Sequence, residues 1–255
     1  MIISHKHRYI FIHCRKTAGS SISNMLSNSL GLWDIQLSAV SETLELGGDI
    51  PLRMWIAALL NSGWRVPVSR MLKRNDLIAM QVKRSYASAL GPKPQHATAS
   101  AVRASFPKEW AMYKKFCVVR NPFSLAVSDY NWRTRNLTAV ERPDFLSYLR
   151  ALEKGDDIGG IVPVGFYNNW QQYAIDDVIV VDEIIRFETL SRDLGQVLSD
   201  LNVPFDGQLP KLKEVMRENK KTKPYRNYYN LEALQLVSEL YQEEIHEFGY
   251  SFDGL

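Results

Sequence analysis

The sequence contains little that would support a disulfide scaffold, a membrane span or a metal site. Its only two cysteines among 255 residues, Cys14 and Cys117, fall in or beside apolar stretches, which predicts reduced side chains in a core. No apolar run reaches the roughly eighteen residues of a membrane-spanning helix, and none precedes residue 9 as a signal peptide would. Histidine, cysteine and carboxylate spacings typical of metal ligands are also missing. The sequence therefore predicts a cytoplasmic protein without a metal.

Charge of one sign is also scarce. The chain has 31 lysines and arginines against 28 acidic residues, a net charge of +3. This small excess suits an anionic ligand but lacks the dense basic patch that nucleic acid requires, so we predict no nucleic-acid partner. No internal repeat, low-complexity tract or linker divides the sequence. With 45% hydrophobic residues, we expect one α/β domain over residues 1–255.

An apolar run, a short basic turn and an amphipathic segment follow one another near the N-terminus. The run Tyr9–Ile12 leads into the turn His-Cys-Arg-Lys-Thr-Ala-Gly-Ser-Ser at residues 13–21. After it, Ile22, Met25 and Leu26 repeat with helical spacing, and Gly31 stands where a C-terminal cap is expected. The pattern predicts a buried strand, a tight loop and a helix.

The chemistry of this turn favours an anion. The first turn of a helix presents backbone N–H groups and the positive end of the helix dipole. Lys16 adds a full charge, and Thr17, Ser20 and Ser21 add hydroxyl groups. We therefore predict a phosphate or sulfate site. An ordinary strand–helix junction with a surface lysine and a serine cap is the alternative.

The order of residues in this turn argues against a nucleotide-hydrolysing P-loop. That motif is G-x-x-x-x-G-K-[ST], with the lysine after its second glycine. Here Lys16 precedes Gly19, the only glycine of the turn. A kinase or NTPase stays an alternative, although we find no clear Walker aspartate.

A second stretch repeats the architecture. The apolar run Phe116–Val119 is followed by Arg120, by Asn121 as a suitable N-cap, and by Pro122 as a suitable first helical residue. Ser128 follows Arg120 by eight residues, so it lies within the helix and can face back toward the strand end. In open α/β sheets, ligands bind beyond the carboxyl ends of the strands. Two such strand ends predict one ligand with two separated anionic groups.

These two stretches resemble motifs of carbohydrate sulfotransferases of the heparan- and chondroitin-type class, family 2. The turn at residues 13–21 resembles their 5′-phosphosulfate loop, and Arg120-Asn121-Pro122, with Ser128 and Tyr130, resembles their 3′-phosphate motif. Two positions depart from the family pattern, because Leu125 stands where many relatives have arginine and Arg15 where proline is usual. Further similar segments are His96–Ala99, Arg186–Leu190 and Tyr225–Gly249.

The resemblance implies a P-loop-like sulfotransferase fold with a mostly parallel sheet. It implies 3′-phosphoadenosine 5′-phosphosulfate (PAPS) as the sulfuryl donor, the bisphosphate PAP as the product, and a glycan or glycolipid hydroxyl as the acceptor. No metal is implied. The catalytic residues would be Lys16 and His96. The donor-binding residues would be Arg15, Lys16, Thr17, Ala18, Gly19, Ser20, Ser21, Arg120, Ser128 and Arg226.

A sulfuryl transfer needs a base for the proton of the acceptor hydroxyl, and an imidazole titrates in the useful range. His96 follows a loop with two prolines and precedes a helix that Thr98 or Ser100 would cap, and we predict it as the base. His13 is the rival, and a purely structural role for His96 is the other alternative. Glu188 is expected in a buried ion pair or cap. The basic segment 219–226 resembles a flap that closes over the donor.

The other elements are predicted from periodicity. Residues 32–76 match no motif and are expected as a variable, acceptor-side segment, with a buried or lid helix over Pro51–Trp64. In that helix, Trp55 and Trp64 would flank an acceptor cleft or contact a membrane surface. We also expect strands at 77–82, 178–181 and 184–187, a polar connection at 138–165, and a long closing helix over 231–248. A non-catalytic module that binds a nucleotide or glycan remains a further alternative.

Overall fold

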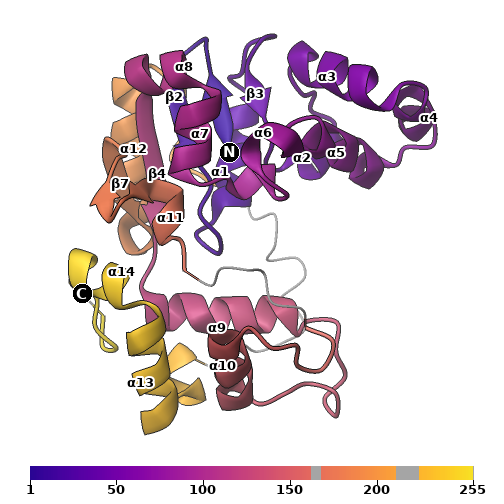
Figure 1. The fold of residues 1–255 in the computed structure, drawn as a ribbon. Helices are drawn as coiled ribbons and strands as arrows, with labels where there is room; N and C mark the ends of the chain where they lie inside the picture. Colours follow the sequence, from indigo (N-terminus) through magenta and orange to yellow (C-terminus); the bar gives the residue numbers. More distant parts are fainter. Residues whose placement is uncertain (162–167, 211–223, 255) are drawn as a thin grey trace. The chain divides into compact units, whose positions relative to one another are not determined.

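The computed structural model describes residues 1–161, 168–210 and 224–254 (Figure 1). These residues form two compact units. The first contains residues 1–119 and 171–210, and the second contains residues 120–161, 168–170 and 224–254. Each unit is described by itself.

A five-stranded sheet forms the centre of the first unit, with strand order β3-β1-β2-β4-β7 (Figure 1). β2 pairs in parallel with β4, and β4 with β7, whereas β1 is antiparallel to both β2 and β3. The sheet is therefore mixed, and the expectation of a mostly parallel sheet holds only for β2, β4 and β7. The strands are β1 (Ile2–Ser4), β2 (Tyr9–Ile12), β3 (Ile35–Gln36), β4 (Lys114–Val119) and β7 (Glu183–Arg186).

The helices of the first unit surround this sheet and extend from it. The helix α1 follows β2 as expected, but its C-cap is Asn28, so the helix does not reach Gly31. The α-helices are α1 (Gly19–Ser27), α2 (Val40–Glu45), α3 (Leu52–Ser62), α4 (Arg65–Met71), α5 (Asn75–Arg84), α6 (Ala87–Leu90), α7 (Ala99–Ser105), α8 (Pro107–Met112) and α12 (Leu190–Asp200). Short 3₁₀ helices are η1 (Pro94–His96) and η2 (Phe187–Thr189).

The core of the first unit explains why the β2–α1 connection folds as the sequence predicts. Tyr9 and Phe11 alternate on one face of β2, and they pack against Ile22 and Leu26 of α1 and against residues of α12 in one buried cluster. Ile10 and Ile12 point to the opposite face, as strand geometry requires, and both are also buried. A strand buried on both faces is apolar throughout, which is the pattern of residues 9–12.

The second unit is built from helices. Its core joins side chains of α9 (Pro122–Arg133), α10 (Phe145–Lys154) and α13 (Leu231–Leu240). Leu125 belongs to this core and is 2% exposed, so the leucine that departs from the family pattern fills a packed interior and is no surface contact. The unit also contains η3 (Tyr225–Tyr228) and α14 (Gln242–Phe248).

Two predicted elements have the wrong type. Residues 77–82 lie within α5 and not in a strand, because Ile78 and Val82 form a buried helical face one turn apart. The expected polar connection at 138–165 contains α10. Its buried residues follow helical spacing, the Asp144 carboxylate accepts a hydrogen bond from the Ser147 N–H at 2.9 Å, and Gly155 ends the helix at φ 73°.

Three further expectations need correction. The segment at 178–181 contributes only β6 (Val178–Ile179), which forms a separate hairpin with β5 (Ala174–Ile175) after the short α11 (Trp170–Tyr173), and Val178 is exposed. Glu188 is exposed, not buried. The closing helix is interrupted at Tyr241, whose backbone at φ −123° is not helical, while Gly249 ends α14 as predicted.

Among the residues that the structure describes, we find no helix with the length and apolar character needed to traverse a bilayer.

Candidate functional site

The turn between β2 and α1 has an unusual backbone. Lys16 and Ala18 both adopt positive φ angles, 61° and 62°, which side chains other than glycine seldom do. Such strain persists where the surrounding structure enforces it, and it clusters at ligand sites. Ala18 is also the N-cap of α1, and its side chain cannot accept a hydrogen bond from the helix start. Successive backbone N–H groups in a turn of this conformation, followed by a helix start, are the kind of geometry that forms anion-binding concavities.

Gly19 brings the start of α1 close to His13. A Cβ atom at position 19 would lie 1.9 Å from the His13 Cδ2 atom, far inside contact distance. Its φ angle is not positive, so the requirement is for space and not for backbone conformation. Because Gly19 has no side chain, α1 can begin in direct contact with the His13 imidazole.

Thr17 acts within the turn. Its side chain is buried, and its hydroxyl donates to the Cys14 carbonyl at 3.0 Å. This hydroxyl hydrogen is engaged inside the loop in this conformation, so Thr17 shapes the turn, and its own contribution to a ligand would come from its backbone N–H. The side chains of Arg15, Lys16, Ser20 and Ser21 are half-buried.

Two histidines lie beside the turn. The His96 Nδ1 atom is 2.8 Å from the His13 carbonyl oxygen, and the ring centroids of His13 and His96 are 4.6 Å apart. A carbonyl oxygen only accepts, so Nδ1 of His96 must carry the hydrogen, which leaves Nε2 as its basic nitrogen. His13 in turn contacts the Ser38 Oγ atom through its Nδ1 atom at 2.6 Å. The hydrogen bond from His96 Nδ1 to the His13 carbonyl fixes the orientation of the His96 ring, as a general base requires.

Burial keeps His96 neutral. Desolvation, with smaller contributions from the positive charges of the N-terminus, Arg15 and Lys83, lowers the pKa of its imidazole to about 3. The hydrogen bond to the His13 carbonyl opposes this shift without cancelling it. His96 is therefore unprotonated at neutral pH, ready to accept a proton but weakly basic. A negative charge placed near Arg15 and Lys16 would offset the positive charges and raise this pKa.

The Arg120 turn belongs to the second unit and is built differently. The Arg120 Nε–H donates to the Ser124 hydroxyl at 2.8 Å. The Asn121 side-chain oxygen accepts from the Phe123 N–H at 3.0 Å, so α9 is capped as predicted, with Pro122 as its first residue. Ser128, half-buried, lies one helical turn beyond Ser124 on the same face of α9.

The strands β2 and β4 are neighbours in the sheet of the first unit. Ile12 of β2 lies opposite Cys117 of β4 in a parallel pairing, so both strands end at one edge of the sheet. The turn with Lys16 follows the first strand end, and Arg120 comes directly after Val119, the last residue of β4.

Two other arginines of the second unit, Arg226 and Arg133, have partners within that unit. The Arg226 guanidinium is exposed and donates to the Asp253 carbonyl oxygen at 2.8 Å. Arg133 forms a buried ion pair with Asp129 at 2.8 Å, and the Tyr148 hydroxyl donates to the same carboxylate. The flap residues at 219–223 lie outside the described residues.

Two contacts of these turns were missed by sequence reasoning. Ser124 stands four residues from both Arg120 and Ser128, and that spacing alone is a signal that could have identified it. The contact of Ser38 with His13 could not be predicted from the sequence, because the two residues are 25 positions apart and Ser38 lies in a segment without a motif. Only the tertiary structure brings them together.

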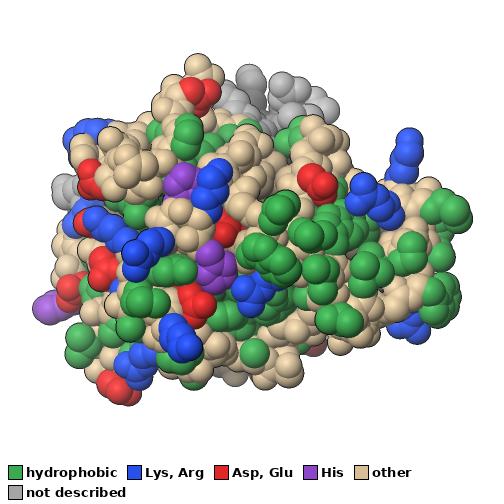
Figure 2. All heavy atoms as spheres, turned by 90° about the horizontal axis from the view of Figure 1, so that it is seen from above, with side chains coloured by type: hydrophobic (Ala, Val, Ile, Leu, Met, Phe, Trp, Pro, Cys, Tyr) green, Lys and Arg blue, Asp and Glu red, His purple; other side chains and the backbone are tan. Residues whose placement is uncertain are grey.

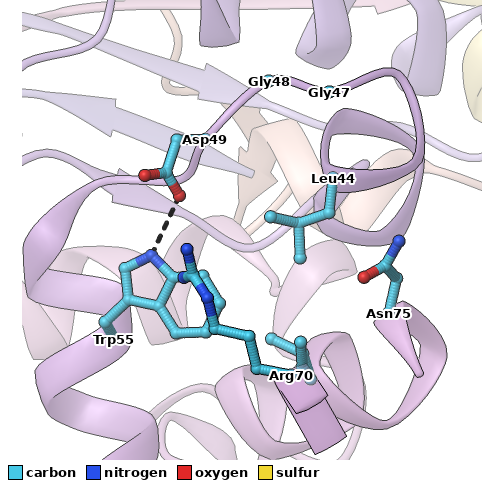
Figure 3. Close-up of a pocket in the computed structure, with 8 residues that line it drawn as sticks. Leu44, Gly47, Gly48, Asp49, Trp55, Arg70 and Asn75 are labelled. Atoms are coloured by element: carbon cyan, nitrogen blue, oxygen red, sulfur yellow. Dashed lines mark hydrogen bonds between the residues drawn. The ribbon is translucent and has the colours of Figure 1, made fainter. Parts of the chain in front are cut away.

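A polar pocket of about 300 Å³ lies within the segment expected as an acceptor-side lid (Figure 3). The Trp55 indole N–H donates to the Asp49 carboxylate at 3.1 Å, and the Arg70 guanidinium lies 4.7 Å from the centroid of the Trp55 ring. Leu44, Gly47, Gly48 and Asn75 also line the pocket. An indole surrounded by a carboxylate, a guanidinium and an amide offers the groups that bind polar, hydroxyl-rich ligands.

No group of three or more potential metal ligands occurs within residues 1–161, 168–210 and 224–254. Comparison with known proteins finds no family model that matches the chain and no match among curated proteins.

Proposed function

We propose that this chain is a PAPS-dependent sulfotransferase that transfers a sulfuryl group to a hydroxyl of a carbohydrate or glycolipid. The observation that carries the proposal is the turn after β2. It combines two non-glycine residues at positive φ, a lysine, a helix start without a side-chain cap, and an adjacent neutral histidine. An anion site beside a base is what sulfuryl transfer needs, and the motif resemblance supplies the choice of donor.

In this proposal, the residues of the turn bind the 5′-phosphosulfate of the donor. The backbone N–H groups from Lys16 to Ser21 donate to its oxygens, and the Lys16 ammonium neutralises the charge that grows on the bridging phosphate oxygen as its bond to sulfur breaks. Such transfers proceed through loose transition states, so positioning and charge stabilisation provide most of the rate enhancement. When bound, PAPS supplies the sulfuryl group and leaves as PAP.

Arg120 and Ser128 would hold the 3′-phosphate. The support is that Arg120 directly follows β4, whose end shares a sheet edge with the end of β2, and that Ser128 lies on the α9 face that Arg120 contacts through Ser124. A planar guanidinium with several donors suits a phosphate. The exposed Arg226 is proposed as an additional residue that contacts PAPS.

His96 would accept the proton of the acceptor hydroxyl through its Nε2 atom as the hydroxyl oxygen forms its bond to sulfur. The tautomer implied by the contact with the His13 carbonyl supports this assignment. The low pKa of about 3 means that the imidazole is a weak base before the donor binds. We expect the negative donor, bound beside Arg15 and Lys16, to raise it. His13 remains the alternative base.

For the acceptor, the pocket beside Trp55 supports a polar, hydroxyl-bearing molecule, since Asp49, Arg70 and Asn75 could share hydrogen bonds with several hydroxyl groups. This pocket lies in the segment that the sequence leaves without a motif.

A thermal-shift titration tests the donor. PAP should raise the melting temperature of the purified protein at micromolar concentration, whereas ATP with Mg²⁺ should raise it little. The opposite preference would favour a kinase or NTPase, and no shift with either would refute the proposal. Incubation with labelled PAPS and a panel of glycan and glycolipid acceptors then tests transfer. Tight PAP binding without transfer to any acceptor would favour a non-catalytic binding module.

A further inference from the structure

The helix α3 is apolar on two faces. Met54 and Ala58 are fully buried toward the unit, as an amphipathic helix requires. Leu52, Ile56, Leu59 and Leu60 follow the spacing i, i+4, i+7 and i+8 on another face, and all four are exposed, Leu60 by 85%. A helix that is apolar on more than one side normally lies within a core or a membrane. Here the second apolar face is left on the surface.

Exposed apolar residues extend beyond α3. Trp64 follows its end and is 72% exposed, and Met71 and Leu72 at the end of α4 are exposed by 75% and 60%. The exposed Leu32 is adjacent, because its carbonyl accepts a hydrogen bond from the Arg53 N–H at 3.0 Å. We call Leu32, Trp33, Leu52, Ile56, Leu59, Leu60, Trp64, Met71 and Leu72 the α3–α4 patch. Scattered exposed apolar residues are normal, but a gathered set of this kind marks an interaction surface.

The charge around the patch is strongly one-sided. From Ile50 to Lys108 the sequence has ten lysines and arginines and a single acidic residue, Asp76. The whole chain has 31 basic and 28 acidic residues, so the remainder carries 21 basic and 27 acidic residues. The ten are Arg53, Arg65, Arg70, Lys73, Arg74, Lys83, Arg84, Lys93, Arg103 and Lys108.

Some of these cations are available to a partner. Arg74 is paired with Asp76 at 2.8 Å, and Arg70 lies over Trp55. In contrast, Arg65 and Lys73 are exposed and form no ion pair within the described part of the chain. Figure 2 shows hydrophobic side chains gathered over the α3–α4 region at the right of the view, with lysine and arginine side chains at their border.

We propose that the α3–α4 patch docks this protein onto an anionic lipid surface. Exposed leucines, an interfacial tryptophan and a border in which basic residues far outnumber acidic ones are the composition of helices that lie in the plane of a bilayer surface. Negatively charged headgroups attract lysines and arginines near the surface, and the apolar side chains enter the headgroup boundary. The one-sided charge favours this partner over a second copy of the chain, because two such patches facing each other would bring like charges together.

Vesicle flotation tests the proposal without any sulfuryl donor, so its outcome is independent of the proposed activity. The protein should float with vesicles of phosphatidylglycerol and phosphatidylcholine in equal parts, and weakly with phosphatidylcholine alone. Raising the salt concentration should reduce the bound fraction. Equal binding to both vesicle types, or binding to neither, would overturn the proposal.

Two matched pairs of variants locate the surface. Leu60→Glu should weaken binding about tenfold or more, whereas Leu231→Glu, a leucine that is 88% exposed on α13, should leave it unchanged. Arg65→Gln with Lys73→Gln should weaken binding to the anionic vesicles by about tenfold or more, whereas Arg135→Gln with Lys154→Gln should not. Because all these side chains are exposed, an unchanged melting temperature verifies folding. Equal losses in the patch and control variants would contradict the assignment.

Light scattering after gel filtration measures the mass of the protein in solution and so tests whether a second copy of the chain covers the patch instead. We expect the wild-type protein and Leu60→Glu to have the same mass in solution. A wild-type dimer that Leu60→Glu converts to a monomer, together with absent vesicle binding, would identify a second copy of the chain as the occupant and refute lipid docking.

Discussion

The two strand-to-helix turns look alike in sequence, yet they begin their helices by different means. At α9, Asn121 caps the first turn with its own side chain and Pro122 fills the first position, so the helix start is satisfied internally. At α1, no side chain caps the helix, and Lys16 and Ala18 hold strained backbone conformations. Capping by a side chain stabilises a helix start, whereas a start without a side-chain cap has its first N–H groups satisfied by other partners, a ligand among them. The comparison suggests that the first turn binds with its backbone and the second with side chains.

The largest effect should come from the lysine of the first turn. Lys16→Ala should lower kcat by about a hundredfold or more, because a charge aimed at the leaving oxygen acts mainly in the transition state. PAP affinity should fall much less. Steady-state kinetics with saturating PAPS measures the change, and Lys108→Ala, an exposed lysine of the same unit, is the control. Unchanged turnover in Lys16→Ala would remove this lysine from the mechanism.

The arginine of the second turn should affect binding rather than turnover. Arg120→Ala should weaken PAP affinity about tenfold to a hundredfold, since it removes charge-assisted hydrogen bonds. At saturating donor, kcat should stay close to that of the wild type. Calorimetric titration with PAP gives the affinity, and Arg135→Ala provides a control that loses an exposed guanidinium of the same unit. If adenosine 5′-phosphosulfate, which lacks the 3′-phosphate, loses affinity equally in Arg120→Ala, the 3′-phosphate assignment is wrong.

Gly19 tests whether the first turn depends on close approach. Gly19→Ala places a methyl group against the His13 ring, and overpacking of this kind costs about 1–3 kcal/mol of the free energy of unfolding. PAP affinity should fall as well, because α1 and the turn move together. Chemical denaturation and PAP titration measure both quantities. Gly195→Ala in α12 is the control, since its Cβ would have ordinary contacts at 3.7 Å.

His96 makes stability depend on pH. Its pKa is about 3 in the folded protein and about 6.5 in the unfolded chain, so the unfolded state binds the extra proton between these values. The contribution of neutral His96 to the free energy of unfolding is therefore fully present above about pH 6.5 and is lost as pH falls toward 3. At pH 5 the loss is about 2 kcal/mol. His96→Gln should lose less stability over the same pH change. Thermal unfolding at both pH values checks this, and equal losses in the two proteins would show that burial does not keep His96 neutral.

The smallest effect should come from the cap of the second turn. Asn121→Ala should reduce the free energy of unfolding by about 1 kcal/mol, as the loss of an N-cap typically does. Donor affinity should remain near that of the wild type, because this side chain serves the helix and the Ser251 carbonyl, to which it donates at 2.9 Å. A loss of PAP affinity as large as that of Arg120→Ala would show that the two turns do not divide their tasks in this way.

Local patterns predicted the elements whose signals lie close together in the chain. The apolar run Tyr9–Ile12, the Asn121-Pro122 start of α9, the Thr98 cap of α7 and the Gly249 end of α14 each depend on neighbouring residues. The same information was present for α10, whose buried Phe145, Tyr148, Leu149 and Leu152 follow helical spacing, but polar neighbours and glycines concealed it. At residues 77–82, a short apolar run suited a strand as well as a helix, and packing against α2, α3 and α4 selected the helix.

By itself, the sequence determined the basic turn, the capped turn and their place after two buried strands, because these depend on residue types at short spacings. Only the tertiary structure decided the mixed sheet, the approach of Gly19 to His13, the contact of His96 with the His13 carbonyl and the resulting low pKa. It also decided that the apolar residues of α3 form two faces, one buried and one exposed. Burial and long-range contacts are properties of the packed chain, and no local pattern specifies them.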